Sequence, residues 1–174
     1  MKNLVVKQLL FTLIIFILFS CSKEENNQSL VNYAATVDNI KFEAASYYAK
    51  ATYSTITKKI TIQGQNQDQT ETISFEMSPL AGSSDWKEGS YNFEPNSNYT
   101  ISAKFVLYDG TSYSTWVSNW TYVKNGSISI QYFSSKRIRG IFAFDLVKQN
   151  SNNTYDNWDL KKVTAGSFDL EFNK

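Results

Sequence analysis

The sequence predicts an all-β fold, an antiparallel β-sandwich or a flattened β-barrel, on three observations. Apolar and polar residues alternate along several segments, which is typical of strands with one buried and one exposed face. Aromatic residues make up 16% of the chain and only two prolines occur, a composition that suits pleated sheets. No segment after the N-terminal leader shows a helical period. Short connections between the alternating segments predict roughly eight to ten strands.

Strict alternation marks the individual strands. It occurs at residues 60–62, 73–77 and 128–130, and the longest run is 138–146, where every even position is apolar or glycine. Residues 137–148 and 163–172 are predicted as the last two strands, joined by a long polar loop over 149–158. The final segment alternates almost to the C-terminus, so we expect a paired strand whose deletion would unfold the domain.

Four glycines open a recurring unit of the form Gly-x-apolar-x-apolar. They are Gly89, Gly126, Gly140 and Gly166. Glycine at the start of a strand commonly supplies a turn or bulge conformation that other residues resist. The two apolar positions are expected to face the core. Because the units are unevenly spaced, they indicate strands rather than a solenoid repeat.

The pair Asp109-Gly110 predicts a two-residue hairpin turn between residues 99–108 and 111–122. This turn pairs Tyr108 with Thr111 and places Ala103 opposite Trp116. One face of the hairpin should then belong to the core: Tyr99, Ile101, Ala103, Phe105, Leu107, Trp116 and Trp120.

Asn125-Gly126 predicts a second tight hairpin, which pairs Val123 with Ile128. In that register Ile128 falls on the face opposite Trp120, and both faces cannot be the same core. We therefore expect either a bulge between Trp116 and Lys124 or a strand that changes sheets.

The N-terminus carries an exported-protein leader. Lys2 and Lys7 precede an apolar run over residues 9–19, which is too short to span a bilayer with ease, and Ser20-Cys21 follows it. The stretch resembles a bacterial lipoprotein signal with its lipobox. The resemblance implies cleavage before Cys21, a diacylglycerol on its sulfur and an acyl chain such as palmitate on its new amino group. The domains predicted are a signal peptide (1–20), a lipidated cysteine with a polar tether (21–32) and one all-β domain (33–174).

The tether begins with Cys21-Ser22-Lys23-Glu24-Glu25. This stretch is similar to the acidic signal that directs Bacteroidota-type lipoproteins to the outer face of the outer membrane. The alternative is a solvated spacer with no addressing role. The resemblance implies an outer-membrane, lipid-anchored protein exposed on the cell surface, with the membrane as its partner through the lipid.

The domain as a whole resembles small Bacteroidota lipoproteins that carry a β-rich domain of unknown function. The matching segments are 35–42, 89–91, 126–130, 140–144 and 166–168. Asn39 stands where that family usually has glycine, and asparagine also tolerates a turn. The resemblance implies a fold and a cell address. It carries no functional residues.

Composition excludes most enzyme chemistry. The chain has no histidine and Cys21 is its only cysteine, which removes the usual general base, cysteine nucleophiles and nearly every zinc site. Loss of Lys2 and Lys7 with the leader leaves 15 basic and 16 acidic side chains, so no positive field attracts nucleic acid. The sequence therefore predicts a protein that is not an enzyme, without cofactor, metal or nucleic-acid partner.

Two tryptophans are candidate ligand-binding residues. Trp86 and Trp158 both lie in segments predicted to be polar loops, and an exposed indole face can stack on a sugar ring. The alternative is that they cap the end of the core. Trp116 and Trp120 are expected in the core.

Two other clusters have both a possible functional role and an ordinary structural one. Asp156 and Asp159, among asparagines, could hold Ca²⁺, but no Asp-x-Asp-x-Asp-Gly loop is present. Arg137 and Arg139 could bind an anion or form a charged outer face.

The leading prediction is a non-enzymatic, lipid-anchored β-domain with a binding or structural role toward a glycan or protein partner. The alternative is a lipocalin-like carrier of a small apolar ligand, which would need an unfilled apolar cavity of several hundred cubic ångströms.

Overall fold

The computed structural model describes residues 32–81, 85–95 and 98–173, all of which belong to the compact unit Val31–Lys174. The predicted signal peptide, Cys21 and the start of the tether lie outside the described residues. Among the residues that are described, no helix is long and apolar enough to cross a membrane.

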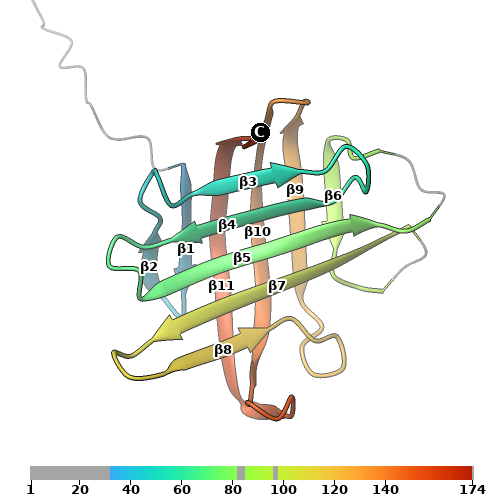
Figure 1. Cartoon of the computed structure of the whole chain (residues 1–174). Helices are drawn as coiled ribbons and strands as arrows, with labels where there is room; N and C mark the ends of the chain where they lie inside the picture. Colours follow the sequence, from blue (N-terminus) through green and yellow to red (C-terminus); the bar gives the residue numbers. More distant parts are fainter. Residues whose placement is uncertain (1–31, 82–84, 96–97, 174) are drawn as a thin grey trace, which may run out of the picture. The chain divides into compact units, whose positions relative to one another are not determined.

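The all-β prediction is confirmed: the described residues form one sheet of 11 strands, and every strand pairing is antiparallel (Figure 1). The strands are β1 (Tyr33–Val37), β2 (Ile40–Glu43), β3 (Lys50–Tyr53), β4 (Ile60–Gln65), β5 (Glu71–Pro79), β6 (Gly89–Asn92), β7 (Tyr99–Tyr108), β8 (Tyr113–Val117), β9 (Gly126–Phe133), β10 (Arg137–Gln149) and β11 (Tyr155–Glu171).

The sheet curls on itself into a half-barrel. Its strand order is β2-β1-β11-β10-β8-β7-β5-β4-β3, with β9 on β10 and β6 on β9. Figure 1 shows β3, β4, β5, β7 and β8 crossing in front of β1, β11, β10 and β9. At the far end of the path β3 returns to the end of β11 through a bridge between Ala51 and Phe172. The two halves of one curled sheet therefore enclose the core between them.

Aromatic rings fill the space between the halves. Phe142 on β10 lies at their centre, with ring centroids 5.4 Å from Tyr33 and 5.2 Å from Phe75. It also stacks on Phe144 at 5.4 Å and on Phe168 at 6.3 Å. The alternation predicted for the last two strands is confirmed, because Phe168 and Leu170 on β11 are buried. A core built of interlocking rings from strands distant in sequence holds the curl together.

Two glycines of the recurring unit have a role in addition to the turn or bulge that was predicted for them. Gly140 pairs with Phe168 and Gly166 pairs with Phe142 across β10 and β11. A Cβ on Gly166 would lie 2.5 Å from the Phe142 ring, and one on Gly140 would lie 2.6 Å from the Phe168 ring. These glycines therefore leave room for the opposite ring. Both also lie at irregularities of the ladder, Gly140 where β10 shifts register against β9 and Gly166 where β11 shifts register against β10, as the predicted bulges require. Only Gly89 among the four has a positive φ, at 149°.

The hairpin at Asp109-Gly110 exists, but its predicted register is wrong by two residues. Tyr108 pairs with Tyr113, and Phe105 rather than Ala103 lies opposite Trp116. The reason is the Asp109 side chain, whose Oδ1 accepts hydrogen bonds from the backbone N–H groups of Thr111 (2.9 Å) and Ser112 (2.8 Å). This Asx geometry lengthens the turn. Because the shift is even, the predicted core face of β7 is retained.

The second predicted hairpin does not form. Val123 lies in no strand, and β9 pairs with β10 and β6 instead of β8. Both β8 and β9 pair with β10, β8 along residues 147–149 and β9 along residues 138–144. The bulge or change of sheet expected between Trp116 and Lys124 is not found either: β8 ends at Val117, all the strands belong to one sheet, and the chain returns to β10 as β9 at a different point along its length.

The polar loop predicted over 149–158 is shorter than expected. β10 extends to Gln149 and β11 begins at Tyr155, so Trp158 lies on β11 and not in a loop. A hydrogen bond from the Asn150 N–H to the Thr154 carbonyl closes the turn at 2.9 Å.

Candidate functional site

Trp158 lies on a bulge of β11 that contains three unpaired residues. Val147 of β10 pairs with Leu160, whereas the next residue, Lys148, pairs with Asp156. Residues 157–159 have no pairing partner on β10 and form the bulge. At the apex of this bulge the Trp158 side chain is 96% exposed.

Side-chain contacts hold the bulge on both flanks. The Trp158 backbone N–H donates to Oδ1 of Asp156 at 3.0 Å. On the other flank Asp159 accepts a hydrogen bond from the indole N–H of Trp116 at 2.8 Å and forms an ion pair with Lys148 at 3.0 Å. The backbone under Trp158 is therefore fixed to the body of the domain, although the indole ring itself is almost wholly in solvent.

A network of charges surrounds Trp116 beneath the bulge. The ammonium groups of Lys148 and Lys161 lie 5.5 and 5.3 Å from its ring centroid, within cation–π distance. Lys161 also pairs with Asp38 at 2.7 Å. Burial alone would raise the pKa of Asp159, but its bonds with Trp116 and Lys148 outweigh that effect and lower the pKa. The pKa of Asp38 is lowered by Lys161 and the Lys162 N–H, again against burial.

Trp86 is not a surface platform. It is 6% exposed and its indole N–H donates to the carbonyl of Lys58. Its ring packs on Tyr91 and Tyr99, with centroids 5.1 and 6.1 Å away. The prediction that Trp86 offers an indole face to a ligand is therefore corrected, and the capping alternative describes this residue. The neighbouring Asp85 holds the segment against β3 and the β3–β4 turn through Tyr53 (2.7 Å) and Lys58 (3.1 Å).

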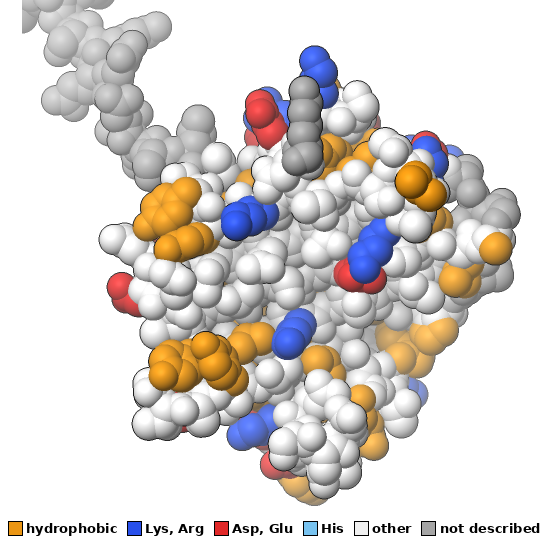
Figure 2. Space-filling model, viewed as in Figure 1, with side chains coloured by type: hydrophobic (Ala, Val, Ile, Leu, Met, Phe, Trp, Pro, Cys, Tyr) orange, Lys and Arg blue, Asp and Glu red, His pale blue; other side chains and the backbone are white. Residues whose placement is uncertain are grey.

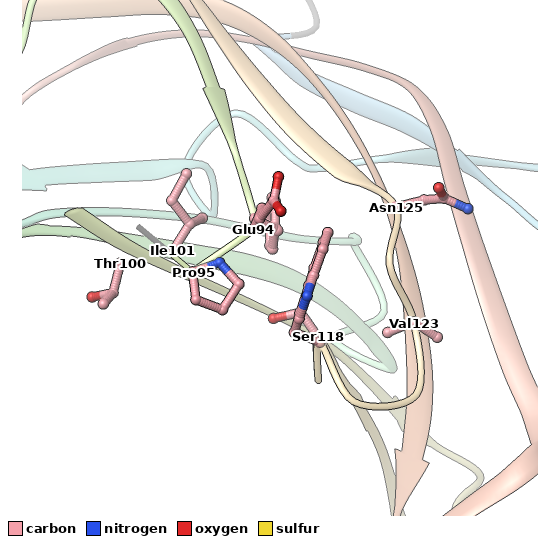
Figure 3. Close-up of a pocket in the computed structure, with 9 residues that line it drawn as sticks. Glu94, Pro95, Thr100, Ile101, Ser118, Val123 and Asn125 are labelled. Atoms are coloured by element: carbon pink, nitrogen blue, oxygen red, sulfur yellow. The ribbon is translucent and has the colours of Figure 1, made fainter. Parts of the chain in front are cut away.

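Trp120, expected in the core, instead lines an open groove of about 170 Å³ (Figure 3). Figure 3 shows Thr100, Ile101 and Pro95 on one side, Ser118, Val123 and Asn125 on the other, and Glu94 between them. The groove lies between the segment after β6, the start of β7 and the connection from β8 to β9. The polar neighbours of Trp120 in the sequence, Asn119 and Thr121, were the available signal that it lies outside the core.

The other predicted clusters have structural partners. The Arg137 guanidinium forms a bidentate ion pair with the carboxylate of Asp169, with hydrogen bonds of 2.6 and 2.7 Å. Asp159 is held by Trp116 and Lys148, as described above. No group of three or more metal-ligating acidic, histidine or cysteine side chains occurs in the described part of the chain.

The face over β3, β4, β5, β7 and β8 is mostly polar, with hydrophobic side chains in small separate groups (Figure 2). Tyr108 and Tyr113 form an aromatic pair at the end of the β7–β8 hairpin, with ring centroids 4.7 Å apart. Isolated aromatic pairs of this size are ordinary on a sheet surface.

A comparison with known protein families matches residues 32–169 to DUF6252, a domain of unknown function. The chain belongs to this family. The matched range covers most of the sheet, from β1 to nearly the end of β11. No curated protein and no solved structure matches the chain. The family membership therefore agrees with a β-rich domain and assigns it no activity.

Proposed function

We propose that this chain is a lipid-anchored, non-enzymatic binding domain displayed at the outer membrane, with Trp158 as its central contact to a glycan or a protein. The observation that carries the proposal is an indole that is 96% exposed on a bulge fixed at both flanks. Tryptophan is among the residues that contribute most to binding interfaces. Its broad apolar face also suits stacking on a sugar ring.

The anchor rests on the leader and on Cys21, which resemble a lipoprotein signal. The domain offers a consistent geometry. The carbonyl of Asn32, where the described domain begins, accepts a hydrogen bond from the N–H of Asp169 near the end of β11. Trp158 lies near the start of the same strand, roughly 26 Å away along the ladder, because Asp169 pairs with Arg139 and the bulge follows the pair of Val147 with Leu160, about eight residues farther along β10 at about 3.3 Å per residue. Residue 32, where the described domain begins, and Trp158 therefore lie near opposite ends of β11.

The absence of histidine and the single cysteine support a non-enzymatic role. The aromatic rings packed around Phe142 favour surface binding over a lipocalin-like carrier, because they occupy the space where a carried ligand would sit.

The anchor is tested by labelling cells that express the full-length protein with radioactive palmitate. We expect label in the wild type and none in Cys21→Ser, with the wild type detected by antibody on intact cells. Unlabelled wild-type protein would contradict the anchor.

The binding role is tested separately, by comparing wild type with Trp158→Ala on immobilised glycans and on candidate protein partners. Binding that is unchanged in Trp158→Ala would remove Trp158 from the contact.

A further inference from the structure

We propose that the groove lined by Trp120 is a second binding site, which holds a single neutral pyranose ring. The site is distinct from the bulge at Trp158 and does not depend on the contact proposed there. Its walls come from the segment after β6, the start of β7 and the connection from β8 to β9.

The size of the groove limits its ligand. Sites for drug-sized molecules are usually about 300–1,000 Å³, whereas this groove holds about 170 Å³. One six-membered ring fits such a space, and a longer glycan would place only one of its rings there and extend into solvent.

The lining selects the chemistry. Trp120, Ile101, Pro95 and Val123 provide an apolar surface, and Glu94, Thr100, Ser118 and Asn125 place polar groups beside it. A ligand with hydroxyl groups can add hydrogen bonds to these polar groups beyond those they make within the protein, which a purely apolar ligand cannot do. The nine lining residues include one carboxylate and no Lys or Arg, which disfavours an anionic ligand. A neutral sugar, with apolar C–H faces and hydroxyl groups at its edge, matches both parts of the lining.

The wall formed by the connection from β8 to β9 is held by hydrogen bonds to the neighbouring strands. Ser118 is tied to Ala103 of β7 twice: its N–H donates to the Ala103 carbonyl at 2.9 Å, and its Oγ accepts from the Ala103 N–H at 2.8 Å. The amide of Asn125 donates to Asp145 of β10 at 2.8 Å.

The turn that carries Trp120 is also closed by hydrogen bonds. The carbonyl of Asn119 accepts from the N–H groups of Tyr122 and Val123, both at 2.9 Å. Binding therefore requires little ordering of this connection, which lowers the entropic cost of holding a small ligand.

The experiment uses full-length protein labelled with 5-fluorotryptophan, in a detergent that carries no sugar headgroup. The four tryptophans give four ¹⁹F signals, which single substitutions assign. The probes are methyl glycosides of glucose, galactose, mannose and N-acetylglucosamine, with choline as an ammonium probe. We expect one of the pyranosides to produce a saturable shift of the Trp120 signal, while the Trp86 and Trp116 signals stay in place.

Two variants sharpen the test. Glu94→Gln should weaken the best pyranoside about tenfold, because it removes a charged hydrogen-bond acceptor. Glu88→Gln, at an exposed acid outside the groove, should leave the affinity unchanged. The proposal is overturned if no pyranoside shifts the Trp120 signal, if choline alone does so, or if Glu94→Gln binds as well as wild type. A response confined to the Trp158 signal would support the bulge and overturn the groove.

Discussion

A hydrogen bond between Trp116 and Asp159 joins the core to the strand segment that carries Trp158, the most exposed large hydrophobic residue in the described part of the chain. The indole N–H of Trp116 donates to the carboxylate of Asp159 at 2.8 Å, across 43 positions of the sequence. Asp159 directly follows Trp158, so a buried tryptophan on β8 fixes the strand segment that presents an exposed one on β11. The bulge thus has a defined structural support, and several measurable consequences depend on it.

Replacing Asp159 by Asn should lower the free energy of unfolding by about 1 kcal/mol at pH 7, because the partly exposed ion pair with Lys148 and a charged hydrogen bond are lost. The pKa of Asp159 is lowered in the folded protein. Its stabilising effect is therefore present above the ordinary pKa near 4 and is lost as the pH falls through the folded value.

Urea unfolding at pH 7 and pH 3 measures this difference. The gap between wild type and Asp159→Asn should shrink at the lower pH. Asp68→Asn, at an exposed turn residue, is the control and should match wild type at both. A gap that grows at pH 3 would contradict the assignment.

Gly166→Ala should destabilise the domain by about 1–3 kcal/mol, because the new methyl group would overlap the Phe142 ring. Ser167→Ala, one residue away on the exposed face, should change stability by less than about 0.5 kcal/mol. Thermal or urea unfolding of the two variants compares them directly, and equal stabilities would show that the ring does not require the glycine.

Alanine substitutions of the two predicted binding tryptophans should change the free energy of unfolding by very different amounts. Trp86→Ala should cost about 3–5 kcal/mol, since a buried ring packed on Tyr91 and Tyr99 is removed. Trp158→Ala should leave stability within about 0.5 kcal/mol of wild type, since its ring is almost wholly exposed. Denaturant unfolding measures both, and a large loss in Trp158→Ala would mean that the ring packs on the domain.

The strands could be predicted from the sequence because alternation is a local signal. The buried positions of β5, β10 and β11 follow directly from it. Which strands pair, and in what register, was harder to predict. The register of the β7–β8 hairpin depends on which backbone N–H groups donate hydrogen bonds to the Asp109 side chain. The pairing of β9 depends on how much of β10 is already paired with β8.

The candidate site was only partly predictable for a similar reason. Trp86 and Trp158 both stand among polar neighbours, and nothing local distinguishes them. The difference comes from distant contacts: Lys58, Tyr91 and Tyr99 enclose Trp86, whereas the unmatched bulge directs Trp158 outward. The groove at Trp120 could likewise not be predicted, because its lining comes from three segments that are separate in the sequence.

The most direct measurement is a glycan array probed with the full-length wild-type protein, Trp158→Ala and, as a matched conservative variant, Trp158→Phe. We predict saturable binding by the wild type that weakens in the phenylalanine variant and falls in the alanine variant to whatever the Trp120 groove alone supports, with all three equally stable. A blank array with folded wild-type protein would contradict glycan binding and leave a protein partner for Trp158. Equal binding by all three proteins would contradict the central claim that Trp158 is the contact.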